Sequence, residues 1–348
     1  MTANGFMPQG VHLVGSFPLE SNTAVFRLAT TILGNHLRRL PDGETGVRKG
    51  WIGWQGAMIR GMPQLEQAAV IGGMGGSYGS HVLYQRRPGV RAEDIQFPSL
   101  GYSAAAIASY AEFVHLKRAG IIPLAVRFEI CLPTPLAPIY TFVVPEDHPA
   151  VETAYETSML TELGEIVAAI PAEDLAIQWD MAVEFAVLEG LIPTHLANAQ
   201  DEIVTRSVRL GDQVPAGVEL GFHLCYGFAG QQHFKEPEDM SKLVSVANGI
   251  AAGLARPLTW LHMPVPRNRT DAAYFAPLKQ LRLPTETELY LGLVHRTDGV
   301  AGTKQRIKAA REVVTHFGVA TECGMGPRPA ESIPELLEIH AAVAAPVR

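Results

Sequence analysis

Three residues of this sequence combine the side chains and the spacing that a zinc site needs. His223 and Cys225 lie two residues apart in GFHLCYGF (221–228), and Cys323 opens the later stretch CGMGPR (323–328). Residues i and i+2 of a β-strand point to the same face, so His223 and Cys225 could reach one point in space. Thiolate and imidazole are ligands that zinc prefers. Cysteines are also common as small buried hydrophobic residues. The pattern therefore indicates either a metal site or a core strand.

The overall composition restricts the classes of protein to which this chain can belong. Of its 348 residues, 47% are hydrophobic and 18% charged, which is enough apolar material for a large core. The formal charge of −7 and the pI of about 6.0 argue against a nucleic-acid-binding surface. No apolar run approaches the roughly 20 residues of a transmembrane helix, and the start MTANGFMPQG lacks the features of a signal peptide. Three cysteines cannot form a disulfide framework, so we expect a cytoplasmic protein without a membrane partner.

Short apolar runs alternate with amphipathic stretches along the whole chain. They predict a single (β/α)8 barrel (TIM barrel) domain over residues 1–348, because apolar strands that alternate with helices form parallel sheets covered on both faces. The expected strands are 12–17, 36–44, 122–130, 175–180, 218–225, 258–265, 288–294 and 317–324, and the expected crossover helices are 21–33, 104–118, 151–169, 239–254 and 301–315. Residues 45–100, with the glycine-rich GGMGGSYGS (72–80), match no phosphate-binding motif, and we expect an extended loop after the second strand.

Reactive side chains gather at the ends of these expected strands, where a barrel of this kind places its active site. They are Ser16, Asp42, Glu44, Asp180, His223, Cys225, His262, His295 and Cys323. A single polar residue at a strand end is ordinary. Two of the three cysteines and three histidines at such ends favour a functional site.

The same residues lie in motifs that resemble the C-terminal catalytic barrel of the cobalamin-independent methionine synthase family, within the wider uroporphyrinogen decarboxylase/methionine synthase-like superfamily. The motifs occur in the family's order: HLVGSFP (12–18), DGE (42–44), FEICLPTP (128–135), IQWD (177–180), HLC (223–225), LGLVH (291–295) and CGMGPR (323–328). The resemblance implies a zinc-dependent transferase that moves a methyl or other alkyl group to a thiol activated as a zinc thiolate.

The resemblance also implies a set of metal ligands. His223, Cys225 and Cys323 would bind Zn²⁺. The family's fourth ligand is a glutamate at the end of strand six, and the matching stretch LTWLHMPV (258–265) has no acid. Either His262 takes its place as a nitrogen ligand, or the fourth position is left to water or substrate.

Further roles follow from the resemblance for the residues that bind substrate. Ser16, Glu44 and Asp180 match the family residues that hold the amino acid end of homocysteine. His295, with Asp180 as a neighbouring acid, is the candidate for protonating the departing group. The expected partners are a small-molecule thiol and an alkyl donor. The donor (folate, corrinoid or another methylated compound) and the oligomeric state stay open.

Three other functions remain compatible with the sequence. A zinc-thiolate enzyme on the same barrel could open an epoxide or cleave a C–S or C–O bond. A metal-free, decarboxylase-like barrel would use Asp180 and leave the cysteines without a role. A non-catalytic corrinoid- or folate-binding protein would bind its ligand and consume no thiol.

Overall fold

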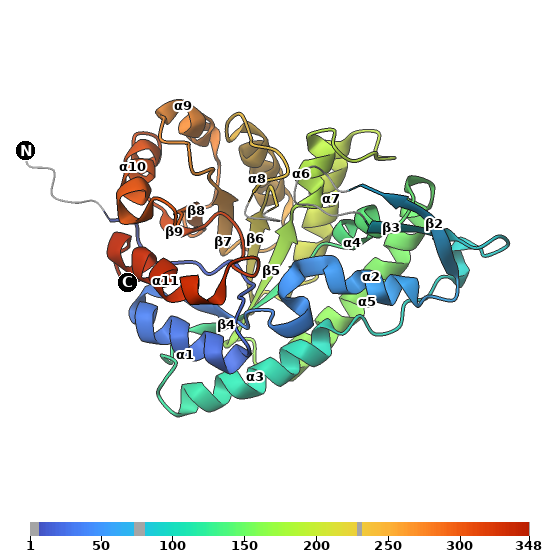
Figure 1. The fold of residues 1–348 in the computed structure, drawn as a ribbon, viewed down its shortest axis with the longest axis horizontal. Helices are drawn as coiled ribbons and strands as arrows, with labels where there is room; N and C mark the ends of the chain where they lie inside the picture. Colours follow the sequence, from blue (N-terminus) through green and yellow to red (C-terminus); the bar gives the residue numbers. More distant parts are fainter. Residues whose placement is uncertain (1–6, 73–80, 228–231, 348) are drawn as a thin grey trace, which may run out of the picture.

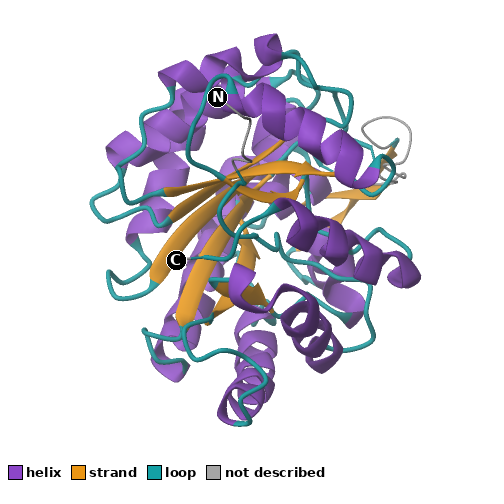
Figure 2. Cartoon of the chain, turned by 90° about the vertical axis from the view of Figure 1, so that its left-hand side faces the viewer, coloured by secondary structure: helices purple, strands orange, loops and turns teal. Residues whose placement is uncertain are grey.

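A curled parallel β-sheet lies at the centre of the computed structural model, which describes residues 7–72, 81–227 and 232–347 (Figures 1 and 2). Seven strands form this sheet, in the spatial order β1-β4-β5-β6-β7-β8-β9, and every neighbouring pair is parallel. Their bounds are β1 (Arg39–Pro41), β4 (Arg127–Pro133), β5 (Leu175–Met181), β6 (Glu219–Leu224), β7 (Trp260–Pro264), β8 (Glu288–Val294) and β9 (Gly318–Thr321). Most of their residues are buried, as expected for parallel strands that are covered by helices.

Helices surround the sheet (Figure 2). All five expected crossover helices are confirmed, as α1 (Asn22–Leu33), α3 (Tyr102–Arg118), α5 (His148–Ala169), α8 (Ser241–Gly253) and α10 (Gly299–Arg311). The described residues also form α2 (Gln55–Arg60), α4 (Leu136–Phe142), α6 (Val183–Leu188), α7 (Ala199–Asp212), α9 (Ala272–Phe275) and α11 (Ile333–Val343). Within the described ranges, no helix has the length and apolar character needed to cross a membrane.

The first expected strand, residues 12–17, is not a strand in the structure. The β-bridges lie just before it: Val11 pairs in parallel with Leu37 on one side and Val319 on the other, and Gln9 pairs with Ala345. The chain then leaves the extended conformation because Gly15 has φ +144, a backbone region that favours glycine. Residues 9–12 therefore lie between the two edges of the sheet, with hydrogen bonds to residues 36, 317 and 319.

The other expected strands are present, most of them with shifted bounds, and the strand expected at 288–294 is confirmed as β8. The second shrinks from 36–44 to β1, since Gly43 (φ +81) turns the chain directly after the strand. The third begins at Arg127 rather than at residue 122 and runs on to Pro133. The last ends at Thr321, before the turn that contains Cys323.

The segment after β1 is long, as expected, but it is not an open loop. It contains a 3-10 helix (Gly46–Trp54), α2, a second 3-10 helix (Ala92–Asp94), and an antiparallel hairpin of β2 (Leu65–Ile71) and β3 (His81–Arg86). The hairpin projects from the body of the molecule (Figure 1). Its β3 strand is tied down by Arg86, whose backbone and side chain both donate hydrogen bonds to Asp147. Of the glycine-rich stretch 72–80, residues 73–80 lie outside the described residues.

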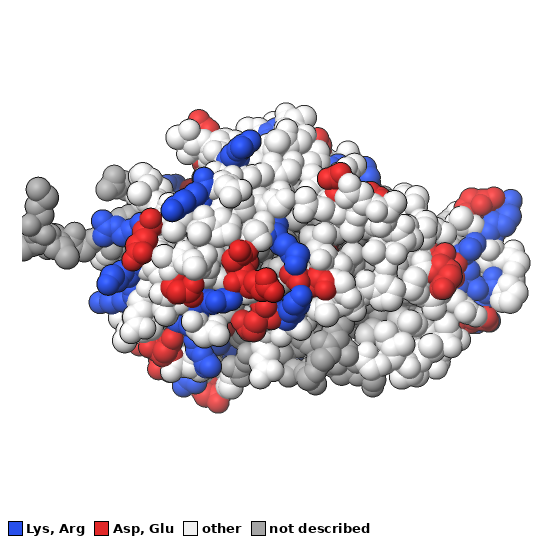
Figure 3. Space-filling view, turned by 90° about the horizontal axis from the view of Figure 1, so that it is seen from above, with Lys and Arg blue, Asp and Glu red and all other residues white. Residues whose placement is uncertain are grey.

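The charged residues of one face are mixed in sign. In Figure 3, Lys and Arg side chains are interspersed with Asp and Glu, and large areas between them carry neither. This face offers no continuous field of positive charge.

Candidate metal centre and substrate pocket

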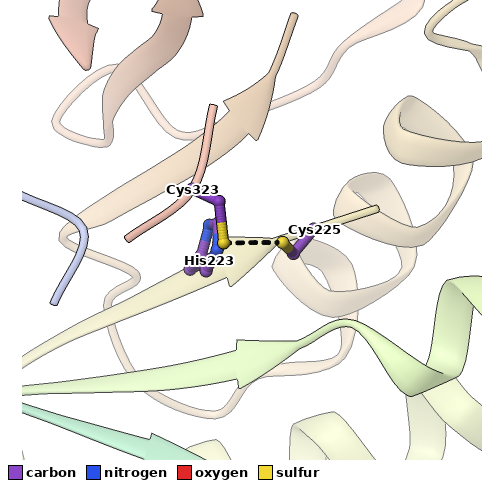
Figure 4. A group of neighbouring side chains, drawn as sticks. All are labelled: His223, Cys225 and Cys323. Atoms are coloured by element: carbon purple, nitrogen blue, oxygen red, sulfur yellow. Dashed lines mark hydrogen bonds between the residues drawn. The ribbon is translucent and has the colours of Figure 1, made fainter. Parts of the chain in front are cut away.

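Strand β6 and the turn after β9 bring two cysteines and a histidine together (Figure 4). The possible ligand atoms of His223, Cys225 and Cys323 all lie within 4.8 Å of one another. The two sulfur atoms are 3.3 Å apart. His223 and Cys225 come from the end of one strand, whereas Cys323 approaches from a segment three strands further around the sheet. The three residues singled out from the sequence therefore form one group in space.

The chemistry of this group fits a zinc ion. Two thiols and one imidazole are the donor set that zinc favours, and three protein ligands leave one coordination position for substrate. Burial raises the pKa of the Cys225 thiol, and the neighbouring Cys323 thiol raises it further. The buried Cys225 sulfur is therefore poorly placed to become a thiolate by itself. A divalent cation bound at this group would stabilise the thiolate.

His262 lies beside this group with other partners for its ring. It pairs with His223 across the β6–β7 register, and the two Nδ1 atoms are 2.6 Å apart. Its Nε2 lies 2.9 Å from the carbonyl oxygen of Thr321. Burial lowers the pKa of His262 to about 3 and also lowers the pKa of His223 well below its ordinary value. Because both ring nitrogens of His262 already have partners, the geometry argues against a role as fourth ligand.

Two buried acids lie near the candidate metal centre. Asp180 is paired in register with His223 on the neighbouring strand, and its Oδ1 accepts a hydrogen bond of 2.9 Å from Gln178. Burial raises the pKa of Asp180 well above its ordinary value, and nearby negative groups add to this shift. Burial likewise raises the pKa of Glu44, and Asp180 and Asp42 raise it further. The two carboxyl groups thus lie close enough to disfavour each other's ionisation.

The segment that carries Glu44 has an unusual backbone. Among the described residues, Glu44 (φ 46) and Trp51 (φ 57) are the non-glycine residues with positive φ. Such conformations cost about 1–3 kcal/mol each and are concentrated at functional sites. Asp42 holds the turn, because its Oδ1 accepts the backbone N–H of Glu44 at 2.8 Å and its Oδ2 pairs with Arg48 at 2.7 Å.

Ser16 packs against the turn that follows Cys323. The N–H of Gly326 donates to the Ser16 hydroxyl oxygen at 3.3 Å, and the N–H of Met325 donates to the Ser16 carbonyl at 2.7 Å. A Cβ at Gly324 would lie 2.4 Å from the same hydroxyl oxygen, so only glycine permits this approach. Because Gly326 uses a lone pair of the hydroxyl, the hydroxyl hydrogen is left to donate to a ligand.

His295 follows β8 and is joined through Glu322 to the turn that carries Cys323. The His295 Nε2–H donates to the carbonyl of Val265 at 2.8 Å, and Nδ1 lies 3.5 Å from Glu322 Oε1. The same carboxylate oxygen accepts a 3.0 Å hydrogen bond from Arg328. Burial lowers the pKa of His295, while Glu322 opposes that shift. Burial alone would raise the pKa of Glu322, but His295 and Arg328 bring it below its ordinary value.

Sequence reasoning missed several polar residues that support the site. Glu322 stands directly before Cys323, and its place at a strand end was a signal that could have revealed it. Gln178 and His12 lie inside the curl of the sheet, where His12 Nε2 is 2.8 Å from Gln178 Oε1. Gln178 then donates to Asp180, as described above. Nothing in their spacing marks these two residues, because the contact between them joins segments far apart in the sequence. Cys131, in contrast, is buried apart from the metal group, beside Glu129.

Fold and site together define a class: an α/β protein with a curled parallel sheet and a His–Cys–Cys group at the carboxyl ends of its strands. Two solved structures with a similar fold are cobalamin-independent methionine synthase-like proteins. A B12-independent methionine synthase from Shewanella sp. W3-18-1, in complex with selenomethionine, has a TM-score of 0.59 and 12% identity, over 97% of this chain and 96% of that one. A putative vitamin-B12-independent methionine synthase from Listeria monocytogenes has a TM-score of 0.57 and 16% identity, over 98% of each chain.

At these identities the likeness shows a shared fold. No family model matches the sequence, and no curated protein matches it either. The function must therefore be argued from the residues of the site itself.

Proposed function

We propose that this chain is a zinc-dependent alkyl transferase of the methionine synthase type, which moves a methyl or other alkyl group from a small donor to a thiol. The observation that carries the proposal is the group of His223, Cys225 and Cys323, whose ligand atoms lie within 4.8 Å of one another. Bound there, Zn²⁺ would lower the pKa of a coordinated substrate thiol, so that its sulfur is a thiolate at neutral pH. The solved methionine synthase-like structures of the same fold support this choice of reaction.

The proposal includes a closed barrel in one catalytic domain formed by residues 1–348. Val11 bridges both to Leu37 and to Val319, so residues 9–12 occupy the gap between β1 and β9. In a (β/α)8 barrel this is the place of the first strand. A closed barrel would bring Ser16, which follows this segment, to the same mouth as the metal centre.

The amino acid end of the thiol substrate would be held by Glu44, Asp180 and Ser16. Glu44 and Asp180 are buried acids whose pKa values are raised and which oppose each other's ionisation. A substrate ammonium between them would favour both carboxylates. The Ser16 hydroxyl, which accepts from Gly326, can donate its hydrogen to the substrate carboxylate. The selenomethionine complex of the Shewanella protein supports an amino acid ligand in this fold.

His295 would supply the proton for the departing group. Glu322 favours the protonated imidazole, which is the form able to release a proton, and so opposes the burial that lowers the pKa of His295. Val265 fixes the ring through Nε2, so that Nδ1, 3.5 Å from Glu322, is the nitrogen from which the proton would leave. Asp180, whose pKa is raised by burial, is the second candidate acid for a thiol substrate that brings no ammonium group. In the transfer, the thiol loses its proton, its sulfur forms the new S–C bond, and the donor's leaving atom takes the bonding pair and a proton.

Metal analysis combined with a substrate screen tests this proposal. Freshly purified protein should contain about one zinc per chain. It should consume homocysteine faster than a thiol that lacks the amino group, with methylcobalamin, methylfolate or a small epoxide as the donor. Glu44→Gln should reduce that preference for the amino thiol. A metal content near zero would refute the zinc mechanism and favour the metal-free alternative, and ligand binding without thiol consumption would favour a binding protein.

A further inference from the structure

His262 occupies the position at which the related family carries an acid, and its surroundings indicate a different use. The residue is fully buried on β7, directly beside His223 on β6. Its ring joins two groups: Nδ1 is 2.6 Å from His223 Nδ1, and Nε2 is 2.9 Å from the Thr321 carbonyl oxygen. A hydrogen-bonded path thus runs from β6 through β7 to β9, the strand that leads to Cys323.

The direction of these hydrogen bonds follows from the carbonyl. A carbonyl oxygen only accepts, so the hydrogen of His262 lies on Nε2. A neutral His262 then presents a lone pair at Nδ1, and the short contact with His223 requires a hydrogen on the Nδ1 of His223. A neutral imidazole has one hydrogen, which leaves Nε2 of His223 as the nitrogen with a free lone pair. That nitrogen is the only one on the ring that can bind a metal.

The backbone around Thr321 is shaped to provide this acceptor. The β8–β9 register shifts between Leu291 and Val294, and such a bulge interrupts the ladder locally. Gly292 lies within the bulge. A Cβ on Gly292 would come within 3.0 Å of the Thr321 carbonyl oxygen and 2.7 Å of the Glu322 Cα. The Thr321 hydroxyl also donates to the carbonyl of Cys323 at 2.7 Å. One residue therefore links the histidine pair to the backbone of a cysteine ligand.

From this geometry we infer that His262 is a positioning residue: it fixes His223 in the Nδ1–H tautomer and is not itself a ligand of the metal. The inference rests on the proposed function and deepens it, because it assigns the fourth coordination position to the substrate sulfur. Two thiolates and a neutral imidazole balance the charge of Zn²⁺. An acid at position 262 would give the same centre a net charge of −1. The neutral centre imposes less repulsion on an incoming thiolate, and this favours a thiol as the fourth ligand.

The first test reads the tautomers directly and needs no metal. The full chain, stripped of metal and labelled with ¹⁵N-histidine, should show His223 with its hydrogen on Nδ1 and His262 with its hydrogen on Nε2. The ring signals are assigned with His223→Gln and His262→Asn variants. His262→Asn retains an oxygen near the place of Nδ1 and should preserve the His223 tautomer, whereas His262→Ala should let the hydrogen move to Nε2. A hydrogen on Nε2 of His223 in the unaltered chain would overturn the inference.

The second test measures zinc affinity by competition with a chelator. Loss of a group that orients a metal-binding histidine typically costs about 10–100-fold in metal affinity, and we expect this loss in His262→Ala. His262→Asn should recover most of it. A true ligand would behave otherwise: Ala and Asn would weaken zinc equally, and that result would overturn the inference.

The two tests separate this inference from the proposed function. If the unaltered chain has the expected tautomers but takes up no zinc, the proposed function fails while the positioning of His223 stands. If it binds zinc and His262→Ala binds equally well, the zinc site stands and the inference fails. If His262→Ala does not fold, the tautomers of the unaltered chain and the affinity of His262→Asn decide the outcome.

Discussion

Replacing one cysteine of the metal group by serine is the most direct test of the proposed centre. The sulfurs of Cys225 and Cys323 are 3.3 Å apart and lie on different segments, so each should contribute its own bond to the metal. Zinc sites with four protein ligands bind with about 10–16 kcal/mol, or about 2.5–4 kcal/mol per ligand. Cys225→Ser or Cys323→Ser should therefore weaken zinc about 10²–10³-fold.

Zinc affinity is measured by competition with a chelator, and the zinc-dependent rise in thermal stability is a second readout. Zinc at about 100 times its Kd adds about 2.7 kcal/mol to the free energy of unfolding, and this gain should vanish in both variants. Cys131→Ser is the matched control, because Cys131 is also a buried free cysteine but lies beside Glu129, outside the group. Full zinc affinity in both Cys225→Ser and Cys323→Ser would refute the reasoning. So would an equal loss of zinc in the control.

Three further predictions concern the surroundings of the centre. Burial raises the pKa of Glu129 from 4.5 to about 8, so its carboxyl stays protonated in the folded chain while the unfolded chain ionises. The stability that the protonated Glu129 contributes is complete below pH 4.5. It is lost as the pH rises toward 8, because the unfolded chain ionises this carboxyl first. Glu129→Gln should remove this pH dependence and raise the free energy of unfolding at pH 8 by about 4 kcal/mol. If the free energies of unfolding of the two proteins change equally across pH 5–8, the prediction is wrong. Asp180→Asn should raise the KM of an amino thiol more than that of a thiol without an amine, and equal changes in KM would exclude an ammonium site beside Asp180. Gly292→Ala places a methyl group 2.7 Å from the Glu322 backbone and should cost about 1–3 kcal/mol of stability, together with part of the zinc affinity. Unchanged zinc binding would show that the bulge has no part in the centre.

The periodic parts of the fold were predictable from the sequence. The five expected crossover helices are present, because their apolar faces repeat locally and depend little on distant residues. The prediction of a first strand at 12–17 was wrong, since Gly15 turns the chain although the apolar pattern continues. The segment after β1 was expected to be a loop. Its hairpin was not predicted, because an exposed hairpin lacks a strongly apolar pattern.

The sequence by itself determined which side chains are available and on which strands they lie. His223 and Cys225 were identified by a spacing of two, and Cys323 by a motif far along the chain. Only the tertiary structure decided what surrounds them. The contact between His223 and His262, and the carbonyl of Thr321 that receives the other nitrogen, join three different strands. Such contacts depend on register, on the bulge in β8 and on the curl of the sheet, and these are set by packing over the whole domain rather than by local sequence.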